Sequence, residues 1–212
     1  LLIKRSKEKE IALVENGKII EYYNEKEEEN KKEGNIYIGV VKDVIKGMQA
    51  AFVDVGVGKN SLIHIKDILE KKDEKIEKVD LNQDISKLIK PNQKLLVQIK
   101  KDSCEKKGAR ISTHINLPGK YIVLMPGTNI ITVSQKIEDN NEQERLINLV
   151  KQSISNCNGA IIRTSAEGKE EEIKKEIKEL EIKWNEIQEE AKKENAKTPR
   201  LLYKSHDIVE KI

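Results

Sequence analysis

Residues 39–64 contain the pattern that decides the fold: Gly39-Val-Val41, then Gln49-Ala-Ala-Phe-Val-Asp-Val-Gly56, then Ser61-Leu-Ile-His64. Apolar side chains recur at every second position in these segments, which predicts short strands with one buried face. The glycine-rich turn before Ser61 favours a tight connection between two of the strands. A single aromatic side chain, Phe52, lies in the middle strand.

Three more segments extend this pattern into a barrel. The predicted strands cover 35–45, 50–56, 61–65, 94–100 and 109–113. Residues 66–91 are rich in Lys, Asp and Glu, and we expect them to form a helical or loop excursion. Five short strands with one long excursion are typical of a small closed barrel of the OB type.

After Pro118-Gly119 the pattern changes to alternating strands and helices. Strands are predicted at 121–125, 129–133 and 159–164, and helices at 142–156 and from 170 to about 195. The last helix is amphipathic, because its apolar residues recur at spacings of three and four: Ile173, Ile177, Leu180, Trp184 and Ile187. The order β-β-α-β-α predicts a small α/β unit, so the fold class is α+β, or mixed.

Both ends of the chain also contain strand patterns. The Asn16-Gly17 turn between the apolar runs 11–14 and 19–22 predicts a β-hairpin. Residues 24–33 are a charged connector, and Leu201-Leu-Tyr203 with Ile208-Val209 indicates the start of another strand region.

Composition limits the function classes. The residues are 37% hydrophobic, 3% aromatic and 36% charged, so small aliphatic cores are expected. The net charge is only +3, from 40 basic and 37 acidic residues. A weak overall charge does not exclude nucleic acid as a ligand, because a local basic patch attracts phosphates.

Cysteine and histidine usage argues against a metal site or a disulfide framework. Cys104 and Cys157 lie far apart, and His64, His114 and His206 have no partner at metal-ligand spacing. No apolar run approaches 18 residues and no signal peptide is present, so we expect a cytoplasmic protein without a membrane span.

Four segments in this order resemble the ribonuclease E/G family. They are the barrel stretch 39–64, Lys107-Gly-Ala-Arg-Ile-Ser-Thr113, Leu117-Pro-Gly-Lys-Tyr-Ile-Val-Leu-Met-Pro126 and Ile162-Arg-Thr164. The resemblance covers essentially the whole chain. It implies a first piece of an RNase H-like subdomain at 1–34, an S1 (OB-fold) RNA-binding domain at 35–113, a 5′-sensor α/β subdomain at 114–200 and the start of a second RNase H-like piece at 201–212.

The resemblance also suggests RNA-binding residues on the barrel. Phe52 fits either a core position or a platform on which a base stacks, and the resemblance favours the platform. Leu62 stands where the family usually has a second aromatic residue, which implies weaker single-strand affinity. Lys101 and Lys107 would contact the RNA backbone, although a lone lysine among 40 basic residues is ordinarily plain surface.

A second site is implied by Arg163-Thr164. A guanidinium and a hydroxyl suit a terminal phosphate, because the guanidinium donates two parallel charge-assisted hydrogen bonds. In the family the matching segment, together with Gly119 and Val123, forms a pocket that senses a 5′-monophosphate. That pocket also receives an arginine from the catalytic region, so we expect it to be incomplete in this chain.

Family members cut RNA with magnesium held by two Asp residues of a later domain, and they form homo-oligomers through a zinc link. The chain ends before either feature, so we expect no catalytic residue and no cofactor in it. The leading hypothesis is single-stranded RNA binding by the N-terminal half of a ribonuclease E/G-like endoribonuclease, inactive alone. The alternatives are the opening 212 residues of the intact enzyme, a free-standing S1-type regulatory module, and a scaffold whose long Lys/Glu helix binds protein.

Overall fold

The computed structural model describes residues 2–5, 9–15, 17–24, 31–72, 75–77, 83–193 and 196–205. Two helices are present in this part of the chain, α2 (Asn140–Ser153) and α3 (Glu170–Lys192). The strands are β1 (Leu2–Arg5), β2 (Lys9–Glu15), β3 (Lys18–Asn24), β4 (Ile36–Ile45), β5 (Ala50–Asp54), β6 (Ser61–His64), β7 (Glu70–Lys72), β8 (Lys75–Glu77), β9 (Lys94–Lys101), β10 (Arg110–Ser112), β11 (Leu117–Pro118), β12 (Ile122–Pro126), β13 (Ile131–Val133), β14 (Asn158–Ile162) and β15 (Arg200–Tyr203).

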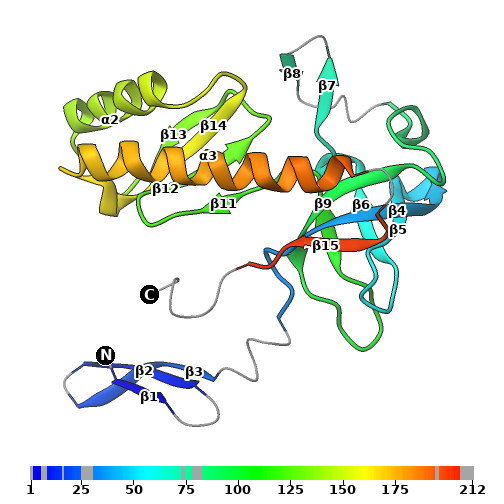
Figure 1. Ribbon diagram of the computed structural model, residues 1–212, viewed down its shortest axis with the longest axis horizontal. Helices are drawn as coiled ribbons and strands as arrows, with labels where there is room; N and C mark the ends of the chain where they lie inside the picture. Colours follow the sequence, from blue (N-terminus) through cyan, green and yellow to red (C-terminus); the bar gives the residue numbers. More distant parts are fainter. Residues whose placement is uncertain are drawn as a thin grey trace.

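Strands β4, β5, β6, β10 and β9 form a closed five-stranded barrel, which confirms the predicted architecture (Figure 1). All of its strand pairs are antiparallel except β6–β10. The ten-residue strand β4 pairs with β9 through its first half and with β5 through its second half. Strand β15 pairs with the part of β4 that β5 leaves free.

The second unit is a four-stranded sheet in the order β11-β12-β14-β13, with helices α2 and α3 packed on it. Strands β13 and β14 are parallel, and α2 makes the crossover that such a pair requires. The predicted strands and helices of this region are confirmed, and β11 is an additional short strand. The buried residues of α3 are Ile173, Ile177, Leu180 and Ile187, as its periodicity predicts.

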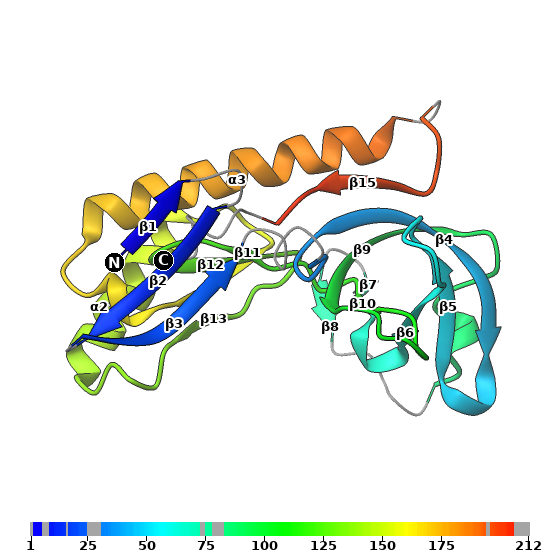
Figure 2. The same cartoon turned by 90° about the horizontal axis from the view of Figure 1, so that it is seen from below.

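The barrel and the second unit share strand β4. Ile36 is fully buried in the core of the second unit, whereas its neighbour Tyr37 is buried in the barrel core. Successive side chains of a strand point to opposite faces, so one strand contributes to both cores. Helix α3 runs from the second sheet towards the barrel and lies beside β15 (Figure 2).

The predicted N-terminal hairpin is confirmed, because β2 and β3 pair antiparallel with Glu15 opposite Lys18. Strand β1 adds to it, giving a three-stranded sheet. The assignment of residues 1–34 and 201–212 to an RNase H-like subdomain stays a prediction. His206, Ile208-Val209 and residues 25–30 of the connector lie outside the described residues.

The excursion between β6 and β9 was expected to be helical or a loop, and its described residues contain no α-helix, so the loop alternative holds for them. Strands β7 and β8 pair as a small hairpin, and two 3₁₀ turns cover Ile65–Asp67 and Ile85–Lys87. Both turns are capped locally: His64 Nδ1 accepts from the amide of Lys66, and Asp84 accepts from that of Ser86. Across the described part of the chain, no helix is long and apolar enough to cross a membrane.

Candidate nucleic-acid interface

The strand register aligns four residues in one row across the barrel. Phe52 of β5 is opposite Leu62 of β6, Leu62 is opposite Arg110 of β10, and Arg110 is opposite Lys101 of β9. Adjacent strands lie about 4.8 Å apart, so the row spans about 14 Å. We call these four residues the barrel row. Its first two residues, Phe52 and Leu62, are apolar, and its last two, Arg110 and Lys101, are basic.

Phe52 faces away from the barrel core. Its neighbours Ala51 and Val53 are fully buried in that core, whereas Phe52 and Leu62 are half-buried and lie outside it. The alternation along β5 therefore excludes the core interpretation of Phe52. A half-exposed aromatic ring beside an apolar side chain offers a flat surface on which a base can stack.

Lys107 lies on the loop between β9 and β10, away from the barrel row itself. The loop turns tightly, since the backbone groups of Cys104 and Lys107 exchange two hydrogen bonds of 3.0 and 3.2 Å. It packs against the β5–β6 connection, where Lys59 Nζ donates to the carbonyl oxygen of Glu105. A Cβ at Gly108 would overlap the carbonyl oxygen of Asn60, so glycine permits this close approach.

At one end of the second sheet, Arg163 contacts Gly119, which the family resemblance assigns to the same pocket. Arg163 Nη1 donates to the carbonyl oxygen of Gly119 at 2.7 Å, and the Arg163 amide donates to that of Tyr121 at 2.8 Å. Thr164 begins a 3₁₀ turn next to them and is exposed. Ser165 Oγ donates to the carbonyl oxygen of Lys120. We call this group the Arg163 corner.

Glu176 of α3 fixes the backbone of the Arg163 corner. Its carboxylate accepts hydrogen bonds from the amides of Lys120, Tyr121 and Ile122, at 2.5, 2.8 and 2.9 Å. A Cβ at Gly119 would lie 2.5 Å from the carboxyl carbon of Glu176, so glycine makes room for that group. The turn that presents the Gly119 carbonyl to Arg163 is therefore held by a residue on another element.

Val123 is placed differently from the other predicted pocket residues. It lies inside β12, opposite Pro118 of β11 and Ile161 of β14. Its neighbours Ile122 and Leu124 are fully buried in the core under the helices, so Val123 is on the other face of the sheet. Pro118 directly precedes Gly119, and Val123 therefore lies one residue pair away from the Arg163 corner.

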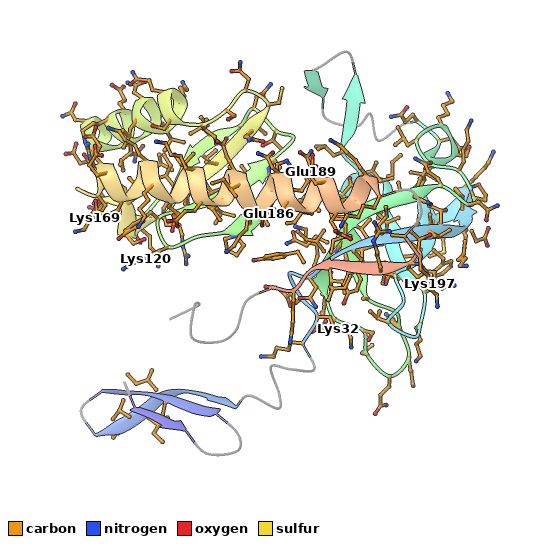
Figure 3. The ribbon with its side chains drawn as sticks, in the orientation of Figure 1. Lys32, Lys120, Lys169, Glu186, Glu189 and Lys197 are labelled. Carbon is orange, nitrogen blue, oxygen red and sulfur yellow. The ribbon has the colours of Figure 1, made fainter. Side chains whose placement is uncertain are left out.

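Sequence reasoning missed Arg110, Ser165, Lys120 and Glu176. Arg110 and Lys120 stand inside segments that support the family resemblance, and Ser165 follows Thr164, so their positions gave some signal. Glu176 is one of many glutamates on α3, and nothing local distinguishes it. In Figure 3, Lys120 and Lys169 lie at the same end of the second unit, where α3 begins.

The described residues contain no group of three or more His, Cys, Asp or Glu side chains that could hold a metal ion. The expectation that this chain has no cofactor remains an expectation.

An OB-type barrel with a half-exposed aromatic, an apolar neighbour and cations in one row defines a class of single-strand nucleic-acid-binding domains. Residues 30–114 match the S1 RNA binding domain, and residues 116–212 match the Ribonuclease E/G family. The two matches adjoin in the order that the sequence resemblance predicts. The chain belongs to the ribonuclease E/G family.

Similar proteins carry the same family name. The chain is 40% identical over 192 residues to "Ribonuclease G" of Salmonella typhimurium (strain SL1344), a match that covers 88% of this chain and 39% of that protein. It is 35% identical over 181 residues to "Ribonuclease E" of Nostoc sp. (strain PCC 7120 / SAG 25.82 / UTEX 2576), covering 84% and 25%. A "Ribonuclease E/G-like protein" of Pyropia yezoensis is 39% identical over 180 residues, covering 84% and 34%. The chain thus spans well under half the length of these relatives.

Proposed function

We propose that this chain is the RNA-holding part of a ribonuclease E/G-type endoribonuclease and binds single-stranded RNA on the outer face of the barrel. The observation that supports the proposal most is the barrel row. A base stacks on Phe52 with Leu62 beside it, and Arg110 and Lys101 receive the phosphates that follow. Lys107, on the neighbouring loop, adds a further cation for the RNA backbone. Leu62 has no π face, so we propose a smaller stacking platform than two aromatic residues would form.

We propose that the Arg163 corner receives a 5′-monophosphate on the RNA. Support comes from the exposed Arg163 and Thr164, with the Ser165 hydroxyl beside them. One Arg163 nitrogen, Nη1, is anchored to Gly119, which fixes the plane of the guanidinium and leaves its other donors for phosphate oxygens. Val123 contributes from β12, where it is paired with Pro118, the residue before Gly119. A further cation from outside the described residues would strengthen phosphate binding at the Arg163 corner.

We propose that this chain holds RNA and does not cleave it by itself. Incubating the purified chain with RNA and magnesium should leave the RNA intact over hours. Cleavage above a protein-free control would contradict the division between an RNA-holding and an RNA-cutting part.

The deciding experiment compares Phe52→Ala with the unchanged chain in binding to a short single-stranded RNA. Loss of the stacking ring should weaken binding by about 1–3 kcal/mol, or roughly five- to 150-fold. Leu201→Ala is the matched control, since Leu201 is a 46% exposed apolar residue of β15 in the same sheet, outside the barrel row. Equal effects of the two substitutions would refute the platform.

The 5′-end proposal needs its own comparison, with RNAs of one sequence bearing a monophosphate, a triphosphate or a hydroxyl group. The monophosphate should bind best, and Arg163→Gln should remove the preference. Lys151→Gln, an equal loss of charge at an exposed position of α2, should retain the preference. Equal affinity for the three ends would leave the barrel as an S1-type binding module without end recognition, which is the alternative function.

A further inference from the structure

A basic cleft of about 510 Å³ opens on the barrel beside the basic end of the barrel row. Its lining includes Lys66, Lys100, Lys101, Arg110, Ser112 and His114. Arg110 and Lys101 belong to both features, so the barrel row leads directly into the cleft. Lys66, Lys100 and His114 have no part in the function proposed above.

The cleft has an excess of positive charge. Asp67 is the one acidic side chain among the described residues of the lining, and Arg110 donates to its carboxylate through Nε at 3.1 Å and Nη2 at 2.9 Å. Lys66, Lys100 and Lys101 have no ion pair with another described residue. Since Arg110 balances Asp67, the described lining carries three further lysine charges, and Arg110 is held in a fixed orientation at its edge.

Lys100 is positioned by a network of fixed partners. It is half-buried, and its Nζ donates to Gln98 Oε1 at 2.9 Å. Gln98 is in turn held by the carbonyl oxygens of Gly34 and Asn116, at 2.9 and 2.8 Å. Burial lowers the pKa of Lys100, and the nearby charges of Asp67 and Glu33 oppose this. A half-buried ammonium with a neutral amide partner gains most from an anion that enters the cleft.

Three hydrogen bonds hold the floor of the cleft together. Ser112 Oγ donates to the carbonyl oxygen of Asp67 at 2.8 Å and accepts from the amide of His114 at 3.0 Å. The amide of Thr113 donates to the same Asp67 oxygen at 2.9 Å. These bonds tie the end of β10 and the two residues after it to the turn that carries Lys66.

We propose that the basic cleft binds a phosphodiester of the same RNA strand, one or more nucleotides beyond the base stacked on Phe52. This inference rests on the proposed function, because the strand reaches the cleft by crossing the barrel row. Lys100 and Lys66 supply the charge on the two walls, and Arg110 guides the strand from Leu62 into the cleft. The cleft thereby sets the direction in which single-stranded RNA leaves the platform.

The test measures RNA affinity as a function of salt for Lys100→Met and Lys66→Gln. Lys100→Met keeps most of the side-chain volume and removes a half-buried charge, so it should fold at least as well as the unchanged chain. Each substitution should lower affinity about five- to tenfold at low salt and reduce the slope of log K against log salt by about 0.7, as expected for one lost phosphate contact on a single strand. Lys90→Gln is the control, because exposed Lys90 precedes β9 at the end opposite Lys100.

A second arm replaces single phosphodiesters of the RNA with uncharged methylphosphonates. One or two replacements should weaken binding to the unchanged chain, and Lys100→Met should be insensitive to them. If both cleft variants match Lys90→Gln while Phe52→Ala still weakens binding, the cleft inference is overturned and the proposed function stands.

A third arm tests anion binding by the cleft in the absence of RNA. Inorganic phosphate, followed by NMR, should shift the His114 and Ser112 resonances of the unchanged chain but not those of Lys100→Met. Such shifts in a chain that fails to bind RNA would refute the proposed function and retain an anion site. If neither the resonance shifts nor the methylphosphonate effect is seen, the inference that the cleft binds a phosphodiester is overturned.

Discussion

Replacement of Glu176 by alanine tests the Arg163 corner most directly. The carboxylate accepts three backbone hydrogen bonds from residues 120–122, of which Ile122 is fully buried and Tyr121 half-buried. The amide of exposed Lys120 can rehydrate, so two of the three donors determine the cost. A donor that loses its partner costs about 1–3 kcal/mol, so two donors would cost about 2–6 kcal/mol. Because Tyr121 is only half-buried and its amide can be partly rehydrated, we expect a loss of about 2–4 kcal/mol in the free energy of unfolding.

Thermal unfolding of the full chain measures this loss. At roughly 2–4 °C per kcal/mol for a chain of this size, Glu176→Ala should lower Tm by about 4–16 °C. The Tm of Glu176→Gln should lie between those of the unchanged chain and Glu176→Ala. The glutamine amide keeps one acceptor oxygen, but its NH₂ group points donor hydrogens towards a backbone N–H. Glu179→Ala is the matched control on the same helix: its side chain is 62% exposed and pairs with Lys175 at 3.8 Å. That change should alter stability by less than about 0.5 kcal/mol.

A Tm of Glu176→Ala within 2 °C of Glu179→Ala would refute the idea that the carboxylate holds this turn. A functional measurement on the same variants extends the test. Since the turn presents the Gly119 carbonyl to Arg163, the preference for a 5′-monophosphate should weaken in Glu176→Ala and be retained in Glu179→Ala.

Three further outcomes are expected. Leu62→Phe should tighten RNA binding by about 1–3 kcal/mol through a second stacking ring beside Phe52, and unchanged affinity in a titration would count against the platform. Backbone N–H groups of its own turn lower the pKa of exposed Cys104. Iodoacetamide should therefore modify Cys104 faster near pH 7 than it modifies an unstructured cysteine peptide. Bound RNA should slow this reaction if the loop that carries Cys104 contacts RNA. Burial, followed by the charge of Lys100, lowers the pKa of His114. As pH falls below about 6.5, the unfolded chain therefore binds more protons than the folded chain, and the free energy of unfolding decreases. This decrease should be less steep in His114→Gln than in the unchanged chain. Urea unfolding at several pH values measures the difference.

Local patterns in the sequence predicted the elements well where a regular period persisted. The alternation in 35–45 and 50–56 became β4 and β5, and the three- and four-residue spacing after Glu170 became α3. The excursion at 66–91 was harder to predict, because its many charged residues show no regular period. Its described part contains a small hairpin and 3₁₀ turns. Strand β11, of two residues, is too short to leave a pattern.

The sequence by itself determined the strand and helix pattern, the polarity of each face and the family order of the segments. These depend on residues two to four positions apart, which a linear pattern displays. Only the tertiary structure decided that Arg110 stands between Leu62 and Lys101, and that Glu176 caps a turn about 55 residues earlier. Cross-strand register and helix docking join distant segments through hydrogen bonds and packing. The spacing of residues along the chain therefore contains no record of which side chains those contacts bring together.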